Sequence, residues 1–598
     1  MGIRHLYTHL SPYAQPETFP RVSITPIYID GPALCHHIYH HLFSSVSTSG
    51  NAFETSISYS VLGDAYGSYL TRLERAGFEI KKIFFDAALP SSKLPTRLSR
   101  LDDNLGKLTR YRSLNPTLRA GCASHITSPS TFFTGSRRQF HARTQHLSAP
   151  PFIVAAVLSY LAAHAVYSQV TETVPGEADS FLGAAAVRYG GIVLTGDSDL
   201  LVFSGGEHDW GVVMLQDLTF TDSGANARVF RARVIEQMLK FPMLDIAYQT
   251  SLDGQASFSS ILTRLERVQE RRRQGVGQSD IPEEFKKEYH LPTEQQRGRV
   301  LEEPRIGELL FQREKGIKTG RRMFLPFLNE DSQRSPAWDI GAEVRRLAYS
   351  ILFENEGEVK EIYRRGQRIT ESVVECYSQE ETKERISSLE LLVAQYPSSW
   401  WAVLVLFNIV DSAKERGQKP NSGAELAAVA KTLLPKDITP PERTRQKWTW
   451  PLVQLFAMSQ AGWYSLLLLR EVLVYCEAKT TVERGMATAA ALRKGLKLLP
   501  DVLRLFDTQQ FLAVFENTEM EEKELAKIAL ARFWAVDADE AAEEEHEDQE
   551  DKNGNGKRPS DEEEWAAAET KKGKKQKKKK QQEKMVVDSN PFAALGMM

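Results

Sequence analysis

The chain has 598 residues, of which 26% are charged, and its formal net charge is −3. This length accommodates two or three domains, each with its own hydrophobic core. The near-neutral balance excludes a chain that binds nucleic acid through its total charge, so any basic surface must be local.

The four cysteines form neither a CxxC pair nor a zinc-binding spacing: Cys35, Cys122, Cys376 and Cys476. We therefore expect no disulfides and a reducing, intracellular compartment. The N-terminal sequence MGIRHLYTHL has no long apolar stretch of the kind that signal peptides carry, and no apolar run approaches a membrane span. The sequence predicts no membrane association.

Two short apolar runs near the N-terminus each end in an aspartate. Ser23 to Ile29 has the β-branched and aromatic residues typical of a strand, and Asp30 follows it. Glu79 to Phe85 is a second predicted strand, followed by Asp86. The segments between them are predicted helices: Ala33 to Phe43 and Ser58 to Ala76.

The next stretch is rich in basic residues: Lys93, Arg97, Arg100, Lys107, Arg110, Arg112, Arg119, Arg137, Arg138 and Arg143. Two interpretations of this irregular segment stay open, a flexible or partly helical arm that contacts phosphates and a solvated loop. Pro151 to Val170 then predicts an apolar helix that covers one face of a sheet.

The stretch from Thr173 to Ser204 brings four acids to two neighbouring element ends: Glu177, Asp179, Asp197 and Asp199. The first two open a predicted helix, and the last two follow the apolar run Ile192 to Leu194, which is typical of a buried parallel strand. Because ligands bind outside the carboxyl ends of strands in an open parallel sheet, Asp30 and Asp86 would converge with these acids.

Clustered carboxylates repel one another unless a cation lies among them, and Mg²⁺ or Mn²⁺ prefers oxygen ligands. The alternative is that the four acids only cap a helix and form a turn. A separate helical pattern spaces His36 and His40, and likewise His37 and His41, four residues apart. No cysteine or acid nearby completes a zinc set, so a polar helix face is the favoured interpretation.

Beyond Ser204 we expect a strand from Trp210 to Leu218 and helices over Ala232 to Leu239 and Arg264 to Arg273. A segment between those helices closes with Asp253. Residues 261–338 are predicted to be a polar insertion or lid. From 339 to 536 the patterns are helical with few strand signals, and the tryptophans are expected in the core: Trp400, Trp401, Trp448, Trp450 and Trp463.

The tail from Asp537 combines an acidic block with a lysine run at Lys571 to Lys580. We expect disorder there, with the lysines serving in nuclear localisation or non-specific nucleic-acid contact. Pro591 to Leu595 is a small apolar island that suggests a docking segment for a protein partner, as does the helical region.

Several ordered blocks resemble the XPG/flap-endonuclease superfamily, most closely its Asteroid branch in a fungal-type form. They are MGI at the start, YIDGPAL around Asp30, FFDAALP around Asp86, VPGEADSFLGAAA around Glu177 and Asp179, and TGDSDLLVF around Asp197 and Asp199. The resemblance covers roughly residues 1–260. It implies a PIN-like α/β nuclease fold, with a mostly parallel sheet flanked by helices, that hydrolyses phosphodiesters with two Mg²⁺ or Mn²⁺ ions.

Carried over block by block, the resemblance implies metal ligation by Asp30, Asp86, Glu177, Asp179, Asp197, Asp199 and Asp253. Asp253 lies in SLDG, where the family has a G-x-D-Y block whose neighbours differ. The resemblance also implies that Lys93 and Arg100, together with Arg97, hold the scissile phosphate. Gly2 would lie near the cleaved strand, and His36 takes the place of an aromatic that stacks on a base.

One departure concerns the grip on duplex phosphates. The family's G-x-G helical hairpin is missing after Asp253, and Gly275-Val276-Gly277 comes late.

Together, the clustered acids and the resemblance predict a metal-dependent, structure-selective nuclease, acting on DNA more readily than RNA and suited to DNA repair. The alternatives are a weak or inactive nuclease-fold scaffold and a small-molecule phosphohydrolase. The predicted domains are 1–260, with a basic arm at about 93–150, then 261–338, 339–536 and the tail 537–598.

Overall fold

The computed structural model describes residues 2–20, 24–45, 51–53, 56–90, 93–118, 147–274, 281–291, 303–395, 448–478 and 490–499. The chain divides into two compact units, Met1–Ala531 and Arg532–Met598, and every described residue belongs to the first. Several predictions concern positions outside the described residues: the lysine run, Pro591 to Leu595, Cys122, the arginines from 119 to 143, Trp400, Trp401 and the helices expected within 400–433 and 522–535.

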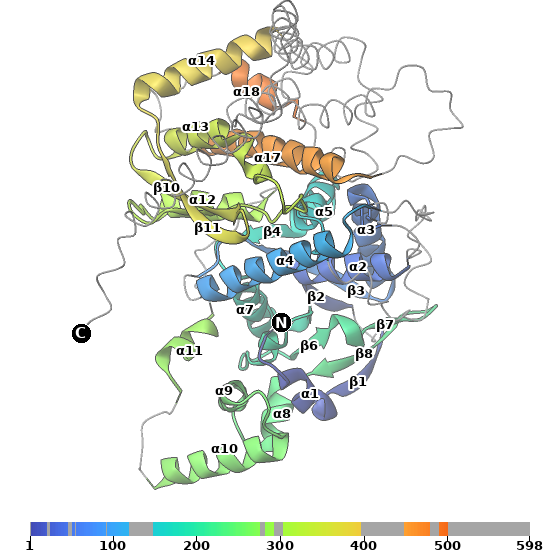
Figure 1. The fold of residues 1–598 in the computed structure, drawn as a ribbon. Coiled ribbons are helices and arrows are strands. Elements are labelled where there is room, and N and C mark those ends of the chain that lie inside the picture. Colours follow the sequence, from blue (N-terminus) through green and yellow to red (C-terminus); the bar gives the residue numbers. More distant parts are fainter. Residues whose placement is uncertain are drawn as a thin grey trace, which may run out of the picture. The chain divides into compact units, whose positions relative to one another are not determined.

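An eight-stranded sheet lies at the centre of the N-terminal part (Figure 1). Its strand order is β1-β8-β6-β5-β2-β3-β4, with β7 paired to β8. The strands from β2 to β6 are parallel, whereas β8 pairs antiparallel with its neighbours. Their bounds are β1 Gln15–Phe19, β2 Thr25–Asp30, β3 Phe78–Asp86, β4 Thr171–Val174, β5 Gly191–Thr195, β6 Trp210–Met214, β7 Thr219–Phe220 and β8 Ala225–Phe230.

Alternating side chains of the central strands build two apolar layers, one on each face of the sheet. Ile27 and Ile29 of β2 pack in the core that contains α2, α3 and α5, whereas Tyr28 faces the core that contains α1, α7 and α9. The predicted α/β class, a central sheet flanked by helices, is confirmed. These helices are α1 Leu6–Leu10, α2 Gly31–Ser45, α3 Tyr59–Arg75, α5 Ile153–Ala163, α7 Ala178–Tyr189 and α9 Met243–Leu252, with α6 Tyr167–Val170, α8 Ala232–Leu239 and α10 Phe258–Arg273 beside them.

The order of the parallel strands reverses between β2 and β5. The chain proceeds from β2 through β3 to β4 on one side, and then returns to place β5 and β6 on the other side of β2. A crevice forms outside the carboxyl ends of strands at such a switch point. The topology therefore places the end of β2 and the end of β5 next to each other, where a ligand would bind.

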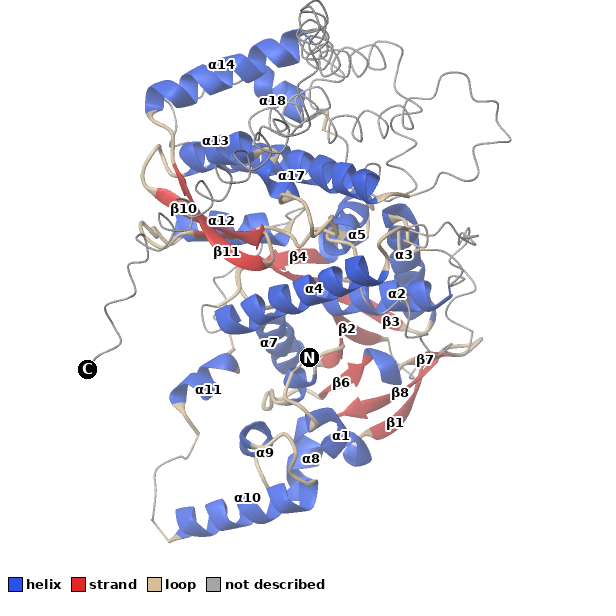
Figure 2. Ribbon diagram, viewed as in Figure 1, coloured by secondary structure: helices blue, strands red, loops and turns tan. Residues whose placement is uncertain are grey.

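The first part of the basic segment is a helix, α4 Leu94–Leu114, which fits a partly helical arm better than a solvated loop (Figure 2). Apolar residues Leu105, Leu108 and Tyr111 are buried at helical spacing, which explains why the segment folds. Arg112 stacks on Trp450 and pairs with Asp331 at 2.9 Å, so the C-terminal end of α4 is tied to the rest of the described chain.

A smaller sheet has the order β11-β10-β9, with β10 and β11 in the region that we expected to be helical and β9 in the expected insertion or lid. The prediction missed β10 Glu358–Arg365 and β11 Arg368–Glu375, which form a hairpin around Gly366 at φ 61°. Most residues of this hairpin are charged or polar, and this masked its strand periodicity. The remaining elements here are α11 Glu283–Glu288, α12 Pro304–Glu314, β9 Arg322–Phe324, α13 Ala342–Leu352, α14 Gln379–Gln395, α17 Trp450–Ala478 and α18 Ala490–Leu496.

The apolar core beneath α2, α3 and α5 continues into this second region. Phe152 lies 5.8 Å from Trp463 and 5.9 Å from Tyr464, measured between ring centroids. Within α17, Trp450–Glu477 is long and apolar enough to cross a membrane, yet 94% of its apolar window is buried inside the structure, as in a core helix. Trp448, Trp450 and Trp463 are buried, as predicted.

Candidate active site

The carboxyl ends of β2 and β5 are linked by a hydrogen bond between side chains. Because Ile29 pairs with Leu194 in the register of the two strands, Asp30 comes to lie beside Thr195. The Thr195 hydroxyl donates to Asp30 Oδ2 at 2.7 Å, and the backbone N–H of Ala33 donates to Oδ1 at 3.0 Å. These bonds fix a buried carboxylate at the reversal of strand order.

The end of β3 is joined to the start of α7. Asp86 Oδ1 accepts a 2.7 Å hydrogen bond from the backbone N–H of Ala178, the first residue of that helix. Glu177 is the N-cap residue and Asp179 lies in the first turn, so both acids also stand at the positive end of the helix dipole. The helix start thereby brings two further carboxylates to the carboxyl edge of the sheet.

The last acid pair lies at the start of a 3₁₀ turn after β5, η5 Ser198–Leu201, with Asp197 as its N-cap residue and Asp199 in the turn. Asp197 Oδ1 accepts from the backbone N–H of Asp199 at 3.1 Å, which caps this turn. Asp199 Oδ1 accepts from the backbone N–H of Ile3 at 2.7 Å, and the Ser198 hydroxyl donates to the Ile3 carbonyl at 3.3 Å. The acid pair is thus tied to the N-terminal segment.

Gly2 lies against the same two aspartates. Its φ is 84°, and a Cβ built there would lie 2.1 Å from Asp197 Oδ1 and 2.9 Å from Asp199 Oδ1. Only glycine combines this backbone conformation with such a close approach. The close contact with the acids is therefore enough to explain a glycine at this position. The predicted position of Gly2 near a cleaved strand is not needed to explain it.

Burial and mutual repulsion disfavour the charged forms of these acids. Burial raises the pKa of Asp30, Asp86 and Asp199 from the ordinary 3.8 to about 6, and in each case the negative charge of Asp197 adds to the effect. Burial, followed by the charges of Asp30, Asp197, Asp86 and Glu177, raises the pKa of Asp179 well above its ordinary value. The six acids therefore form a single electrostatic cluster, which we call the acid edge.

Two of the predicted basic residues face the acid edge. Lys93, the N-cap residue of α4, places Nζ 3.5 Å from Glu177 Oε1. Burial alone would lower its pKa, but the charges of Glu177, Glu288, Asp199 and Asp179 outweigh burial and raise it. Arg100 is exposed two turns further along α4, and its charge lowers the pKa of Asp86.

Three other predicted site residues have different surroundings. Arg97 pairs with Glu308 at 2.6 Å and stacks on Phe324 at 3.7 Å, so its charge is directed toward α12 and β9. Asp253 pairs with Arg264 at 2.9 Å and accepts from the backbone N–H of Gln255, so its charge is directed toward α10. His36 is exposed on α2, with its ring centroid 6.4 Å from that of His40.

Helix α11 and its C-cap contribute two residues that the sequence analysis did not single out, Glu288 and Tyr289. The Glu288 carboxylate affects the pKa of Lys93, Glu177 and Asp199. Tyr289 packs on Phe203 at 5.7 Å, and Asp199 and Asp197 are among the charges that, after burial, raise its pKa. The sequence analysis predicted only that 261–338 is a polar insertion or lid, and it did not identify these two residues.

No group of three or more His, Cys, Asp and Glu side chains in the described ranges is already arranged to hold a metal ion. Several carboxylate oxygens instead accept hydrogen bonds from the backbone, from Thr195 or from Lys93. The chemistry of the donor set nevertheless fits a hard divalent cation, because burial and then mutual repulsion raise the pKa values of these carboxylates, and such a cation would offset both effects.

Residues 149–376 match a family model described as XPG domain containing. The matched range includes Glu177, Asp179, Asp197 and Asp199, and it extends through β11. Over this range the chain is therefore similar to XPG domains, which supports the broader part of the predicted resemblance. Membership of the Asteroid branch stays a prediction.

Two solved structures are similar to the chain at a distance. One is the catalytic core of Rad2 in complex with DNA substrate, at 13% identity and a TM-score of 0.27. The other is the catalytic core of Rad2 in another complex, at 14% identity and a TM-score of 0.25. Each alignment covers 48% of this chain and 76% of the other. No curated protein matches the chain.

Proposed function

We propose that the protein is a divalent-metal-dependent nuclease that hydrolyses phosphodiester bonds of nucleic acid, with DNA as the preferred substrate. The observation that carries this proposal is the acid edge, where carboxylates from the ends of β2, β3 and β5 and from the start of α7 meet beside Lys93. The match of residues 149–376 to an XPG domain supports it.

The ligands in this proposal are Asp30, Asp86, Glu177, Asp179, Asp197 and Asp199. Divalent ions held by these carboxylates would supply an activated water and stabilise the leaving oxygen. Asp30 and Asp86 are held by backbone and hydroxyl donors, so they enter the site with defined orientations. Asp253 has Arg264 as its partner, and its ligation stays a prediction.

Lys93 and Arg100 are proposed to bind the scissile phosphate. Both lie on α4 at the side of the acid edge, and a cation there offsets the charge that develops on the phosphate oxygens. Binding of a phosphate would compete with Glu177 for the Lys93 ammonium. Arg97 is proposed to support this surface through α12, because its guanidinium is already paired with Glu308.

Metal binding and cleavage are tested separately. Calorimetry measures the affinity for Mn²⁺ of the wild-type protein and of Asp199→Asn. We expect the variant to bind Mn²⁺ at least tenfold more weakly. A Mg²⁺-dependent assay on single-stranded, flap, splayed and RNA substrates should then give cleavage that Asp199→Asn removes. Equal residual cleavage by both proteins would contradict the nuclease assignment.

A second candidate function is a nuclease-fold scaffold that binds nucleic acid without cutting it. The observation that favours it is that no three side chains of the described residues are already grouped around a metal position. This alternative predicts salt-sensitive binding of the same substrates with no Mg²⁺-dependent product. Nuclear localisation through Lys571 to Lys580 is proposed for either function, and fusion of the tail to a fluorescent reporter tests it.

A further inference from the structure

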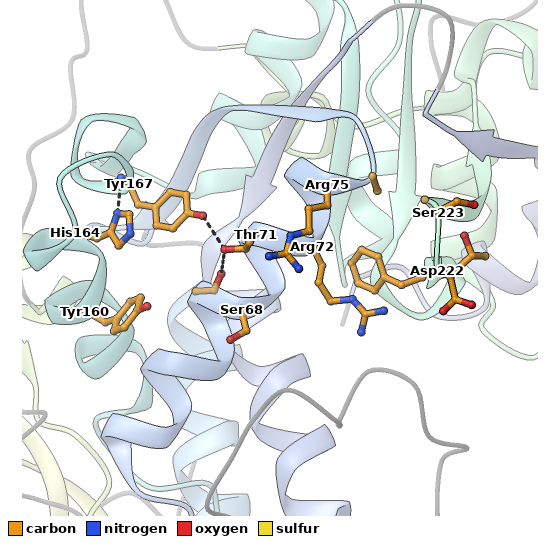
Figure 3. A pocket seen from close by; sticks show the side chains of 14 residues that line it. Ser68, Thr71, Arg72, Arg75, Tyr160, His164, Tyr167, Asp222 and Ser223 are labelled. Atoms are coloured by element: carbon orange, nitrogen blue, oxygen red, sulfur yellow. Dashed lines mark hydrogen bonds between the residues drawn. The ribbon is translucent and has the colours of Figure 1, made fainter.

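A second site lies at the opposite edge of the large sheet from the acid edge. A pocket of about 570 Å³ is enclosed by the C-terminal half of α3, the end of α5 with the start of α6, and the turn between β7 and β8 (Figure 3). Because α3 leads into the start of β3, this pocket lies at the amino ends of the strands. The length of β3, about 30 Å at 3.3 Å per residue, separates it from Asp86.

One wall of the pocket presents positive charge and hydroxyl groups. Ser68, Thr71, Arg72 and Arg75 follow one another at helical spacing on a single face of α3. The Arg72 guanidinium lies 4.7 Å from the ring centroid of Phe220, which belongs to the facing strand β7. In Figure 3 both arginines lie between the aromatic wall and the Asp222–Ser223 turn. Paired guanidinium groups are suited to bidentate contacts with a phosphate.

A second wall, next to α3, is aromatic and closely packed. Tyr160 packs so closely on α3 that a Cβ at Gly67 would lie 2.2 Å from its hydroxyl oxygen. His164 stacks on Tyr167 at 4.3 Å, and the Tyr167 hydroxyl donates to Glu74 at 3.1 Å. Such fixed rings offer flat surfaces on which a planar ligand stacks at a small cost in conformational entropy.

The third wall supplies acceptors and further hydroxyls. Thr221 and Gly224 close the β7–β8 turn through a 2.9 Å backbone hydrogen bond, and Asp222 and Ser223 line the pocket. Asp222 and the nearby Glu74 are negative, so the charge around the pocket is mixed. A simple polyanion would therefore meet repulsion, whereas a ligand with one phosphate and several N–H or O–H donors would satisfy both kinds of group.

We infer that this pocket binds a nucleoside monophosphate. The phosphate would contact Arg72 and Arg75, the base would stack on the Tyr160 and His164 wall, and Asp222 would accept from the sugar hydroxyls or an amino group. The volume lies within the range of small-ligand sites and exceeds what an inorganic anion fills. This inference is independent of the proposed nuclease function, because no residue of the acid edge takes part.

The test is calorimetric titration of the full chain with adenosine monophosphate in EDTA, so that the acid edge holds no metal. Arg75→Ala should weaken binding at least tenfold, and Ser68→Phe, which fills the pocket, should abolish it. Arg233→Ala removes an exposed arginine outside the pocket and should change the affinity less than twofold. Circular dichroism of each variant checks the fold, and Arg75 is exposed, so its removal leaves the core intact.

Adenosine and inorganic phosphate should each bind at least tenfold more weakly than the nucleotide. The inference is overturned by absence of nucleotide binding, by equal affinity in Arg75→Ala and wild type, or by inorganic phosphate binding as tightly as the nucleotide. Asp86→Asn should leave the affinity for the nucleotide unchanged. Loss of cleavage by this variant would bear on the nuclease proposal alone.

Discussion

The aspartates of the acid edge carry a stability penalty that depends on pH. The folded-state pKa of Asp86 is about 6 against an ordinary 3.8, so the folded protein binds more protons than the unfolded chain between about pH 4 and 6. The free energy of unfolding therefore falls as the pH rises through this window, and the penalty is complete above pH 7. A bound divalent cation would remove much of it.

We predict that Asp86→Asn stabilises the metal-free protein at pH 7.5 by up to about 3 kcal/mol, from about 1.4 kcal/mol per pKa unit. The asparagine oxygen still accepts from the N–H of Ala178, so the orientation is kept. Urea unfolding in EDTA at pH 7.5 and pH 5 measures the effect, which should shrink at pH 5. Asp102→Asn, exposed on α4, is the control, and an equal gain there would contradict the explanation.

Gly2 offers a second test at the same scale. Gly2→Ala places a methyl group 2.1 Å from Asp197 Oδ1 at a φ of 84°, so the N-terminal segment must leave Asp199. We expect a loss of about 1–3 kcal/mol in the free energy of unfolding. Gly106→Ala on α4, where a Cβ meets nothing within 4 Å, should instead be neutral or stabilising. Equal effects of the two changes would exclude a special role for Gly2.

Residue identities alone allowed most of the acid edge to be predicted. Asp30, Asp86 and the pair after β5 follow strands with strong apolar patterns, and the structure brings all of them together. Arg97 and Asp253 could not be resolved in this way, because their partners Glu308 and Arg264 are chosen by packing. Whether a charged side chain is exposed or paired depends on residues distant in sequence, as for Arg97, or on the packing of the next helix, as for Asp253.

At the scale of elements, the charge of Glu288 on α11 acts on residues of the acid edge, and in the proposed function it would oppose the approach of a polyanion. Glu288 stands near Lys93 and Glu177, so it adds negative charge where a phosphate is proposed to bind. Its position depends on packing of Phe285, whose ring centroid lies 5.2 Å from that of Tyr248, and of Tyr289, whose ring centroid lies 5.7 Å from that of Phe203. A sequence pattern of charged residues could not place this helix against Phe203 and Tyr248, because the pattern fits any solvated helix.

We predict that Glu288→Gln tightens nucleic-acid binding about two- to fivefold at low salt, because one repulsive charge is removed. Fluorescence anisotropy in EDTA measures binding without cleavage, and the difference should vanish at high ionic strength. Glu284→Gln changes an exposed acid of the same helix that does not act on Lys93 or Glu177. The assignment of Glu288 to the binding path fails if both variants bind alike.

At the scale of the whole molecule, the described N-terminal and C-terminal regions share one apolar core. Phe152 at the start of α5 contacts Tyr464 of α17, and Glu303 accepts a 2.9 Å hydrogen bond from the Tyr464 hydroxyl. Arg112 of α4 reaches Asp331 in the same way. The boundaries expected at 260 and 338 are therefore crossed by buried contacts, although they separate different sequence patterns.

We predict that Phe152→Ala lowers the free energy of unfolding by about 3–5 kcal/mol, the usual cost of removing a buried aromatic ring. The α/β part and the helical part should unfold together, because the cavity opens in their common core. Denaturant unfolding followed by tryptophan fluorescence and by circular dichroism should give coincident transitions. Two separate transitions would indicate independent domains, as the sequence boundaries suggested.

The sequence by itself determined the strand–aspartate pattern, the α/β class and the acids of one sheet edge, because hydrophobic periodicity and strand ends are local properties. The tertiary structure decided the order of the strands, the polar hairpin of β10 and β11, the approach of Glu288, and the pocket opposite the acid edge. Each of these depends on contacts between residues far apart in the chain, whose free energy appears only when the elements pack.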